Sequence, residues 1–367
     1  MERLAPNETN QKFVASLQAL RFLAASMVLI SHLLIETRAH PLRGMIAVYD
    51  PTKIKWATGV DIFFIISGFI IYYLTKDKFG VPGFAKSFIK NRFVRVVPLY
   101  WVYLTLFIIV ALVSKSSING TDISLMRVVS SYLFLPWPRS DGTFYPVFEI
   151  GWTLNFEIMF YFVFSAALLF SKKAGLTLLS AAFIMLAMFG LLTRTSISFL
   201  MFYTRPIIIE FLFGILIAHF YVKGIRLPAL VRITMVAAGF IALTWAVAHS
   251  IQSDIHLRPF WGGIPAALIV SGVVLGPDIR GDAWYTNLIV IGGNVSYSLY
   301  LTHMFSLRLL SIIWEKLALP GGLLYFGVSF TVAMFGAYVA YRIVEQPLLA
   351  LMRRGVRRKS ATAAVTV

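Results

Sequence analysis

Long runs of apolar residues, separated by short polar segments, dominate the pattern along this chain. An α-helix rises about 1.5 Å per residue, so about 20 apolar residues are enough to cross the hydrocarbon core of a bilayer. Most of the runs have this length, and the pattern therefore predicts an all-α, polytopic transmembrane protein with about ten spans. The expected spans cover residues 17–35, 56–75, 92–113, 147–170, 175–193, 203–222, 229–249, 259–277, 287–312 and 321–346.

The same pattern predicts the domain organisation. Residues 1–16 form a polar cytoplasmic segment, residues 17–348 a single transmembrane domain, and residues 349–367 a basic cytoplasmic tail. The widest gap between spans, at 114–146, predicts a long outer loop, and its 126–135 part has the spacing of an amphipathic surface helix. Long loops in compact proteins are often functional, so this loop is a candidate for contact with a substrate.

Composition supports a membrane protein and excludes several classes of function. Hydrophobic residues make up 59% of the chain and charged residues 13%, whereas a soluble domain carries about 25% charged residues. The formal net charge is +17, but 21 of the 33 Lys and Arg residues fall on one side of the predicted spans. This bias is typical of the cytoplasmic side, so both termini are expected in the cytoplasm and nucleic-acid binding is not expected. The absence of cysteine excludes disulfides and thiolate catalysis.

Two ionisable residues lie on the first apolar run, Arg21 near its start and His32 near its end. Their separation of eleven residues, at about 100° each, leaves them about 20° apart around a helix and roughly 16 Å apart along its axis. Both groups are costly to expose to lipid, so they are expected to face a cavity and to have a function. The separation is close to the reach of an extended pantetheine arm, which suits a site for coenzyme A.

Further polar residues interrupt the later apolar runs. Arg92 and Arg95 share one helix face at the inner end of the third span, where two guanidinium groups suit a phosphate or diphosphate. Glu157 lies in the otherwise apolar fourth span, and His303 lies near the middle of the ninth. Arg92, Arg95, Glu157 and His303 can each have a function in catalysis or binding, or only a structural role as a membrane anchor or as a partner of another helix. Their spacing alone allows both interpretations. Asp61 opens the second span and is expected to cap its helix.

Seven segments, in their order and spacing, resemble the acyltransferase-3 family of integral membrane acyltransferases. In this family the first span carries Arg or Lys, ten residues and then His, which Arg21 and His32 match, and the third span carries Arg-x-x-Arg, which Arg92 and Arg95 match. The resemblance extends over about residues 14–348. The segments are LQALRFLAASMVLISH (17–32), GVDIFFIISGFII (59–71), FIKNRFVRVVPLYW (88–101), WTLNFEIMFY (152–161), FLFGILI (211–217), NVSYSLYLTH (294–303) and YRIVEQP (341–347).

The resemblance implies an O-acetyltransferase of glycans in a bacterial inner membrane. Such an enzyme moves an acyl group, usually acetyl from cytoplasmic acetyl-CoA, to a hydroxyl of an exported glycan or a lipid-linked oligosaccharide. Glycan-assembly proteins are expected as partners. Some relatives carry a fused extracytoplasmic hydrolase-like domain, and this chain is expected to lack one. Either its membrane domain acylates the glycan itself, which is the favoured alternative, or a separate partner protein does.

His32 is the first catalytic candidate, because acyl transfer to a hydroxyl needs a base near neutral pH. It either deprotonates the sugar hydroxyl or accepts the acyl group transiently, and the sequence allows both routes. Glu157 and His303 are the further catalytic candidates. The candidates for binding the phosphates of acetyl-CoA are Arg21, Arg92 and Arg95.

Other readings stay open at this point. Trp137, Tyr145 and Trp152 flank the outer loop, and they either stack on sugar rings or form an aromatic belt at the membrane interface. No metal-ligand spacing is present, so no metal is expected. A transporter or flippase of a glycan or lipid also places charges inside the membrane and is the alternative from another class. A succinyl rather than an acetyl donor is the alternative within the family.

Overall fold

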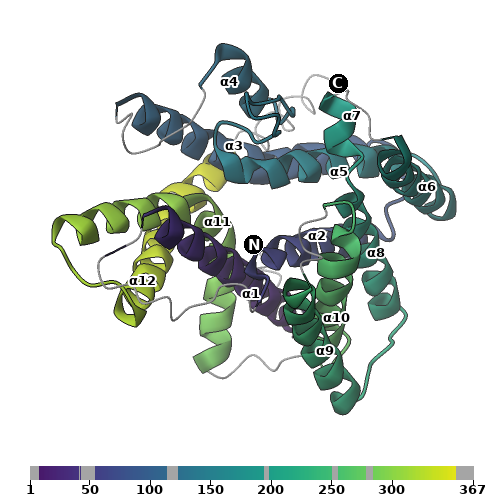
Figure 1. The fold of residues 1–367 in the computed structure, drawn as a ribbon. Coiled ribbons are helices and arrows are strands. Elements are labelled where there is room, and N and C mark those ends of the chain that lie inside the picture. Colours follow the sequence, from purple (N-terminus) through teal and green to yellow (C-terminus); the bar gives the residue numbers. More distant parts are fainter. Residues whose placement is uncertain are drawn as a thin grey trace. The chain divides into compact units, whose positions relative to one another are not determined.

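A computed structural model describes residues 8–40, 42, 54–113, 123–193, 198–249, 255–277 and 284–352. Every regular element within these ranges is helical (Figure 1), and none of them contains a strand. This confirms the all-α prediction. The first helix begins at Glu8, inside the segment expected to precede the first span, and residues 353–367 of the expected tail lie outside the described residues.

Seven helices among the described residues are long and apolar enough to cross a membrane, which confirms a polytopic membrane protein. They are Ala15–Ala39, Trp56–Thr75, Phe84–Val113, Glu149–Ala167, Lys172–Thr193, Ala229–Ala246 and Leu323–Met352. The other three expected spans also coincide with helices. Pro206–Val222 and Pro259–Val274 are apolar but shorter, and Trp284–Lys316 carries a row of polar side chains that lowers its hydropathy.

The helices cluster into two compact units, each assembled from segments that are distant in sequence. The first unit combines Met1–Lys76, Phe183–Leu192 and Thr204–Gly336. The second combines Asp77–Ala182, Thr193–Tyr203 and Ala337–Val367. The region expected as one domain thus contains two clusters of helices, and each is described separately below.

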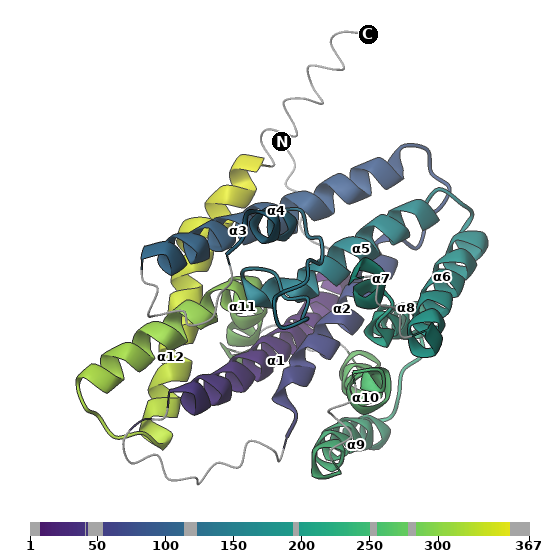
Figure 2. The ribbon, with the colours of Figure 1, turned by 45° about the horizontal axis from the view of Figure 1, so that its top comes forward.

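In the first unit, three pairs of helices make the main contacts (Figures 1 and 2). The pairs are α1 (Glu8–Ala39) with α11 (Trp284–Lys316), α2 (Gly59–Thr75) with α8 (Ile209–Val222), and α9 (Ala229–Ala248) with α10 (Ile264–Val274). Short turns η2 (Trp56–Thr58), η4 (Pro206–Ile208) and η6 (Pro259–Gly263) lead into α2, α8 and α10, and most of α12 (Leu323–Ala340) belongs to this unit.

The second unit is built around α3 and α5, which pack against each other. Its elements are α3 (Phe84–Val113), α4 (Leu125–Tyr132), η3 (Glu149–Gly151), α5 (Trp152–Ala167), α7 (Ser198–Tyr203) and η7 (Tyr341–Glu345), while α6 (Lys172–Thr193) is shared between the units.

The α4 helix confirms the surface helix expected within 126–135. Arg127 is buried, whereas Leu125 and Met126 are exposed, so the polar side of this helix faces protein and its apolar side faces outward. This orientation is the reverse of that in a soluble domain and fits a helix lying in the membrane interface.

Close approach of α2 and α8 depends on two glycines. A Cβ atom at Gly68 would lie 2.1 Å from the carbonyl oxygen of Phe211, and one at Gly214 would lie 2.0 Å from that of Ile65. Small residues of this kind let transmembrane helices gain packing contacts that larger residues would prevent.

We therefore expect Gly68→Ala and Gly214→Ala to destabilise the protein by about 1–3 kcal/mol, because the added methyl group pushes the two backbones apart. Thermal melting of the purified protein in detergent measures the loss. Gly327→Ala is the matched control, since a Cβ atom on that helical glycine meets nothing within 4 Å. Equal melting temperatures for all three variants would contradict the role assigned to the two glycines.

Candidate active site

The contact between α1 and α11, the most extensive in the first unit, contains three polar contacts. Gln18 Nε2 donates to Asn294 Oδ1 over 2.7 Å, two imidazoles meet farther along, and Arg308 Nη1 lies 3.3 Å from Glu36 Oε1. Residue numbers increase together along both helices, so α1 and α11 run parallel. One side of α1 thus presents its polar residues to α11.

The central contact brings together His32 and His303, which we call the His pair. Nδ1 of His32 lies 3.1 Å from Nε2 of His303, and the ring centroids are 4.9 Å apart. His303 is only 1% exposed, so its imidazole is enclosed by protein. The sequence identified both residues as candidates, but it did not predict that they touch.

Two backbone carbonyls determine the tautomers of the His pair. Nδ1 of His303 lies 2.9 Å from the oxygen of Leu299, and Nδ1 of His32 lies 3.1 Å from that of Val28. A carbonyl oxygen only accepts, so both Nδ1 atoms carry the proton. Nε2 of His303 then acts as an acceptor and shares the one Nδ1 proton of His32 with the Val28 oxygen, and the lone pair of His32 resides on its own Nε2. An imidazole in this form is suited to act as a base or a nucleophile.

Arg21 lies eleven residues before His32 on the same helix, and α1 is continuous between them. The predicted separation of roughly 16 Å along the axis is therefore uninterrupted. Arg21 Nη1 donates to Gln18 Oε1 over 3.3 Å, and Gln18 in turn contacts Asn294. This contact ties the guanidinium group to the side of α1 that faces α11.

The second unit holds the other cationic candidates. Arg92 on α3 lies over the ring of Phe88 at 5.6 Å, and its charge interacts with those of Arg95 and Glu157. Glu157 on α5 also accepts a hydrogen bond from Tyr161. Glu157 thus lies beside the arginines in this unit, as expected for a residue that neutralises them.

The candidates therefore fall into two groups, one in each unit. The first unit contains Arg21, His32 and His303, and the second contains Arg92, Arg95 and Glu157. In the first group His32 and His303 contact each other and Arg21 lies on the same helix as His32, and in the second the charge of Arg92 interacts with those of Arg95 and Glu157. Binding of a common ligand by the two groups stays a prediction, and so does a catalytic role for Glu157.

Comparison with known proteins reveals the family. Residues 14–342 match the acyltransferase-3 profile, described as an acyltransferase domain. The chain belongs to the acyltransferase-3 family. It is 33% identical over 310 residues to exopolysaccharide production protein ExoZ of Rhizobium meliloti (strain 1021), which covers 83% of this chain and 92% of the relative. It is 25% identical over 398 residues to nodulation protein 10 of Rhizobium leguminosarum bv. viciae, covering 97% and 99%. No solved structure matches the chain.

The family match confirms the resemblance and includes every candidate from Arg21 to His303. Together with the membrane-spanning helices, it identifies the protein as a multi-pass membrane O-acyltransferase. The alternative of a transporter has no such support.

A second buried polar cluster of this acyltransferase lies where α2, α8 and η6 begin. Asp61 is fully buried and accepts hydrogen bonds from Nε and Nη2 of Arg258, at 3.0 and 2.9 Å. Glu210, also buried, interacts with Asp61. The expectation that Asp61 caps its helix is wrong, because Thr58 occupies the N-cap position and the carboxylate binds Arg258 instead. A buried carboxylate needs a cationic partner more than a helix needs a side-chain cap.

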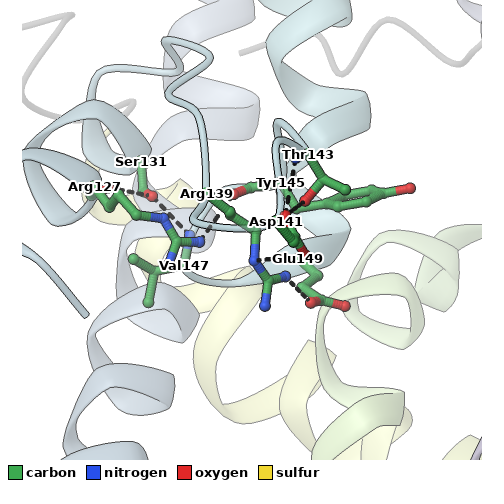
Figure 3. A network of polar contacts seen from close by, with 8 residues as sticks. All are labelled: Arg127, Ser131, Arg139, Asp141, Thr143, Tyr145, Val147 and Glu149. Atoms are coloured by element: carbon green, nitrogen blue, oxygen red, sulfur yellow. Dashed lines mark hydrogen bonds and ion pairs between the residues drawn. The ribbon is translucent and has the colours of Figure 1, made fainter. Parts of the chain in front are cut away.

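The loop before α5, which the sequence predicts on the outer side, is held by the network in Figure 3. Arg139 pairs with Glu149 and lies 3.8 Å from Asp141. Thr143 donates to Asp141 Oδ1 from its backbone nitrogen at 2.9 Å and from its hydroxyl at 2.6 Å. These hydrogen bonds lower the pKa of Asp141, so its carboxylate stays ionised to lower pH than an isolated one.

The same loop is fastened to α4, as Figure 3 also shows. Arg127 Nη2 donates to the carbonyl oxygen of Tyr145 at 3.1 Å. Ser131 Oγ donates to the Arg127 carbonyl at 2.6 Å and accepts from the backbone nitrogen of Val147 at 2.9 Å. The loop therefore has a defined path, and the side chains of Trp137 and Tyr145 stay partly exposed on it.

Within the described ranges, no group of three or more His, Cys, Asp or Glu is arranged to hold a metal ion. The absence of a metal from the reaction stays a prediction.

Sequence reasoning missed several residues of these contacts. Gln18 precedes Arg21 by three residues and His32 by fourteen, so it lies on the same helical stripe, and this spacing was the available signal. Asn294 had no such signal, because its role depends on which helix lies opposite. Arg258 gave no signal because it lies just before the expected span 259–277, outside the apolar run, and its partner Asp61 is distant in sequence.

The tautomers of the His pair are open to a direct test. In the protein labelled with 15N-histidine, we expect both His32 and His303 to be protonated on Nδ1, because each Nδ1 faces a carbonyl oxygen. Solid-state NMR in lipid measures this, with His32→Ala and His303→Ala used to assign the signals. A neutral His303 protonated on Nε2 would contradict the assignment.

Proposed function

We propose that the enzyme transfers an acyl group, acetyl by preference, from cytoplasmic acetyl-CoA to a hydroxyl of an exopolysaccharide or of its lipid-linked precursor. The His pair carries the proposal, because it supplies a base or nucleophile with a determined tautomer inside the membrane region. The relative ExoZ, described as an exopolysaccharide production protein, supports a glycan acceptor.

In one route, His32 acts as a general base. Its Nε2 takes the proton of the sugar hydroxyl while the hydroxyl oxygen attacks the thioester carbonyl carbon. The C–S bond then breaks, and the departing coenzyme A thiolate takes the proton from His32. As His32 becomes positively charged, its hydrogen bond to His303 strengthens, so His303 acts as a positioning residue.

In the other route, His32 is a nucleophile. Its Nε2 attacks the thioester carbonyl, coenzyme A leaves as the thiolate, and an acyl-imidazole forms. The sugar hydroxyl then attacks the acyl carbon, its proton passes to the thiolate, and the imidazole is restored. Both routes use the same tautomer, and a single turnover with labelled acetyl-CoA and no acceptor distinguishes them, because only the second labels the protein.

For the donor, we assign the phosphates of acetyl-CoA to three guanidinium groups. Arg21 lies roughly 16 Å along α1 from His32, a distance that suits the pantetheine arm. Arg92 and Arg95 bring two further cations on one helix face of α3. Charge-assisted hydrogen bonds of this kind are the usual means of holding phosphate.

For the acceptor, we assign the outer loop to the glycan side. Trp137 and Tyr145 are partly exposed on a loop fixed by its own hydrogen bonds, and aromatic faces of this kind stack on sugar rings. This assignment assumes both termini in the cytoplasm of a bacterial inner membrane. Proteins of glycan assembly that deliver the acceptor are the expected partners.

We expect His32→Ala to lower the rate of transfer at least about hundredfold, because it removes both the base and the nucleophile. The measurement is transfer of labelled acetyl from acetyl-CoA to a crude glycan fraction, together with release of coenzyme A. His303→Ala should lower kcat about tenfold, and His303→Gln should recover much of it, because its amide oxygen can accept from Nδ1 of His32. Full activity of His32→Ala would overturn the mechanism.

We expect Arg92→Ala and Arg95→Ala each to raise the acetyl-CoA concentration for half-maximal rate about tenfold, by loss of a charge-assisted contact. Binding of coenzyme A to the purified protein checks this directly. Lys90→Ala is the control on the same helix, since Lys90 is exposed. Unchanged affinity for coenzyme A in both variants would indicate that Arg92 and Arg95 anchor the helix at the membrane surface instead of binding the donor.

Two alternatives are tested by the same assays. Release of coenzyme A from acetyl-CoA by membranes that contain the protein distinguishes a transferase from a transporter. Faster release from succinyl-CoA than from acetyl-CoA would favour the succinyl donor.

A further inference from the structure

The third polar contact between α1 and α11 is an ion pair with no role in the mechanism above. Arg308 Nη1 lies 3.3 Å from Glu36 Oε1, and we call these residues the Glu36–Arg308 pair. Glu36 follows His32 by four residues, so it lies one turn, about 6 Å, farther along α1 and near the same face. The pair thus lies beyond the His pair, on the side away from Arg21.

The Glu36–Arg308 pair differs from the Asp61–Arg258 pair in its access to ligands. Asp61 is fully enclosed and its partner Arg258 keeps 13% of its side-chain surface exposed, whereas Glu36 and Arg308 both keep some exposure, 14% and 24%. Ionisable groups in a membrane-spanning region are costly and face protein or a water-filled space. A pair that holds the helices together has no need of this exposure, but a pair that meets a ligand does.

One buried tyrosine lies beside the Glu36–Arg308 pair. Tyr325, at the start of α12, interacts with both charges, and its hydroxyl lies near those of Ser311 and Ser329. The ring of Trp314 lies edge-on to Tyr325, with centroids 5.3 Å apart. These four side chains are buried and support the pair from behind, so the groups that a ligand can reach are the carboxylate of Glu36 and the guanidinium of Arg308. A carboxylate that accepts beside a guanidinium that donates suits a saccharide, whose hydroxyls both donate and accept.

We propose that the Glu36–Arg308 pair is the acceptor subsite, at which Glu36 accepts from one sugar hydroxyl and Arg308 donates to the oxygen of its neighbour. The ligand class is a neutral saccharide with adjacent hydroxyl groups. The proposal rests on the function proposed above. It adds that the two substrates approach His32 from opposite ends of α1, the donor from the side of Arg21 and the acceptor from the side of Glu36.

The test separates acceptor binding from donor chemistry. Purified full-length protein is assayed with labelled acetyl-CoA and two acceptor probes. One is cellotetraose, and the other is the lipid-linked oligosaccharide fraction from membranes of the organism that produces the protein. Glu36→Gln removes one charge with little change of shape, and Arg308→Gln removes the other charge together with the guanidinium group. We expect each to raise the KM for an acceptor about tenfold to hundredfold, because a hydrogen bond to a charged group is lost.

The donor side is expected to stay unchanged in these variants. Affinity for coenzyme A and the slow release of coenzyme A without acceptor should match those of the unmodified protein. Glu315→Gln is the matched control, since Glu315 is exposed on the same helix and makes no described ion pair. It should leave the KM for acceptor unchanged.

A charge exchange distinguishes recognition from a structural role. In the double variant Glu36→Arg with Arg308→Glu, an ion pair can form again, so a structural pair would regain both melting temperature and activity. We expect the melting temperature to recover while the KM for acceptor stays raised, because a determined hydrogen-bond pattern has been inverted. Recovery of acceptor KM, or an unchanged KM in both single variants, would overturn the proposal.

Failure of the proposed function would look different. The unmodified protein would then transfer no acetyl to either probe and release no coenzyme A. A third outcome is that the unmodified enzyme is active but the single variants lose affinity for coenzyme A as well as for the acceptor. That outcome would also overturn the acceptor subsite, and the role proposed for His32 would be unaffected.

Discussion

Inside a bilayer, a polar group must find its partner within the protein, and this constraint organises the first unit. Gln18, His32 and Glu36 lie along one side of α1, and each meets a polar residue of α11. The helices come close because glycines lie at the contact, where a Cβ atom at Gly293 would lie 2.4 Å from the Gln18 side chain. Parallel helices joined at three levels hold the two imidazoles of the His pair in one relative orientation.

Two ion pairs of this enzyme lie in different surroundings. Asp61 is fully buried and accepts two hydrogen bonds from Arg258 where three short helical segments begin, and Glu210 adds a second buried carboxyl group there. Removing one partner of such a contact leaves an uncompensated charge, so it favours one arrangement of the helices strongly. Both members of the Glu36–Arg308 pair keep some exposure, which suits the binding role proposed for it.

How much of the site was predictable varies from residue to residue. Arg21 and His32 could be found because helical spacing is a local property, and eleven residues return a helix to nearly the same face. Arg92 and Arg95 could be paired for the same reason. The contact of His32 with His303 joins residues 271 positions apart, and no periodicity connects them. The pairing of Asp61 with Arg258 was missed likewise, and a local rule, helix capping, predicted the wrong partner.

By itself, the sequence determined the class of this protein: an all-α membrane enzyme of the acyltransferase-3 family, with its helices close to the expected ranges. Hydropathy and helical period act over tens of residues, so they can be read along the chain. Only the tertiary structure decided which helices lie side by side, and through them the tautomer of His32, the partner of Asp61 and the position of the Glu36–Arg308 pair. The physical reason is that the pairing of helices in lipid depends on matching shapes and on hydrogen bonds between distant segments. Neither can be predicted from the sequence of one segment alone.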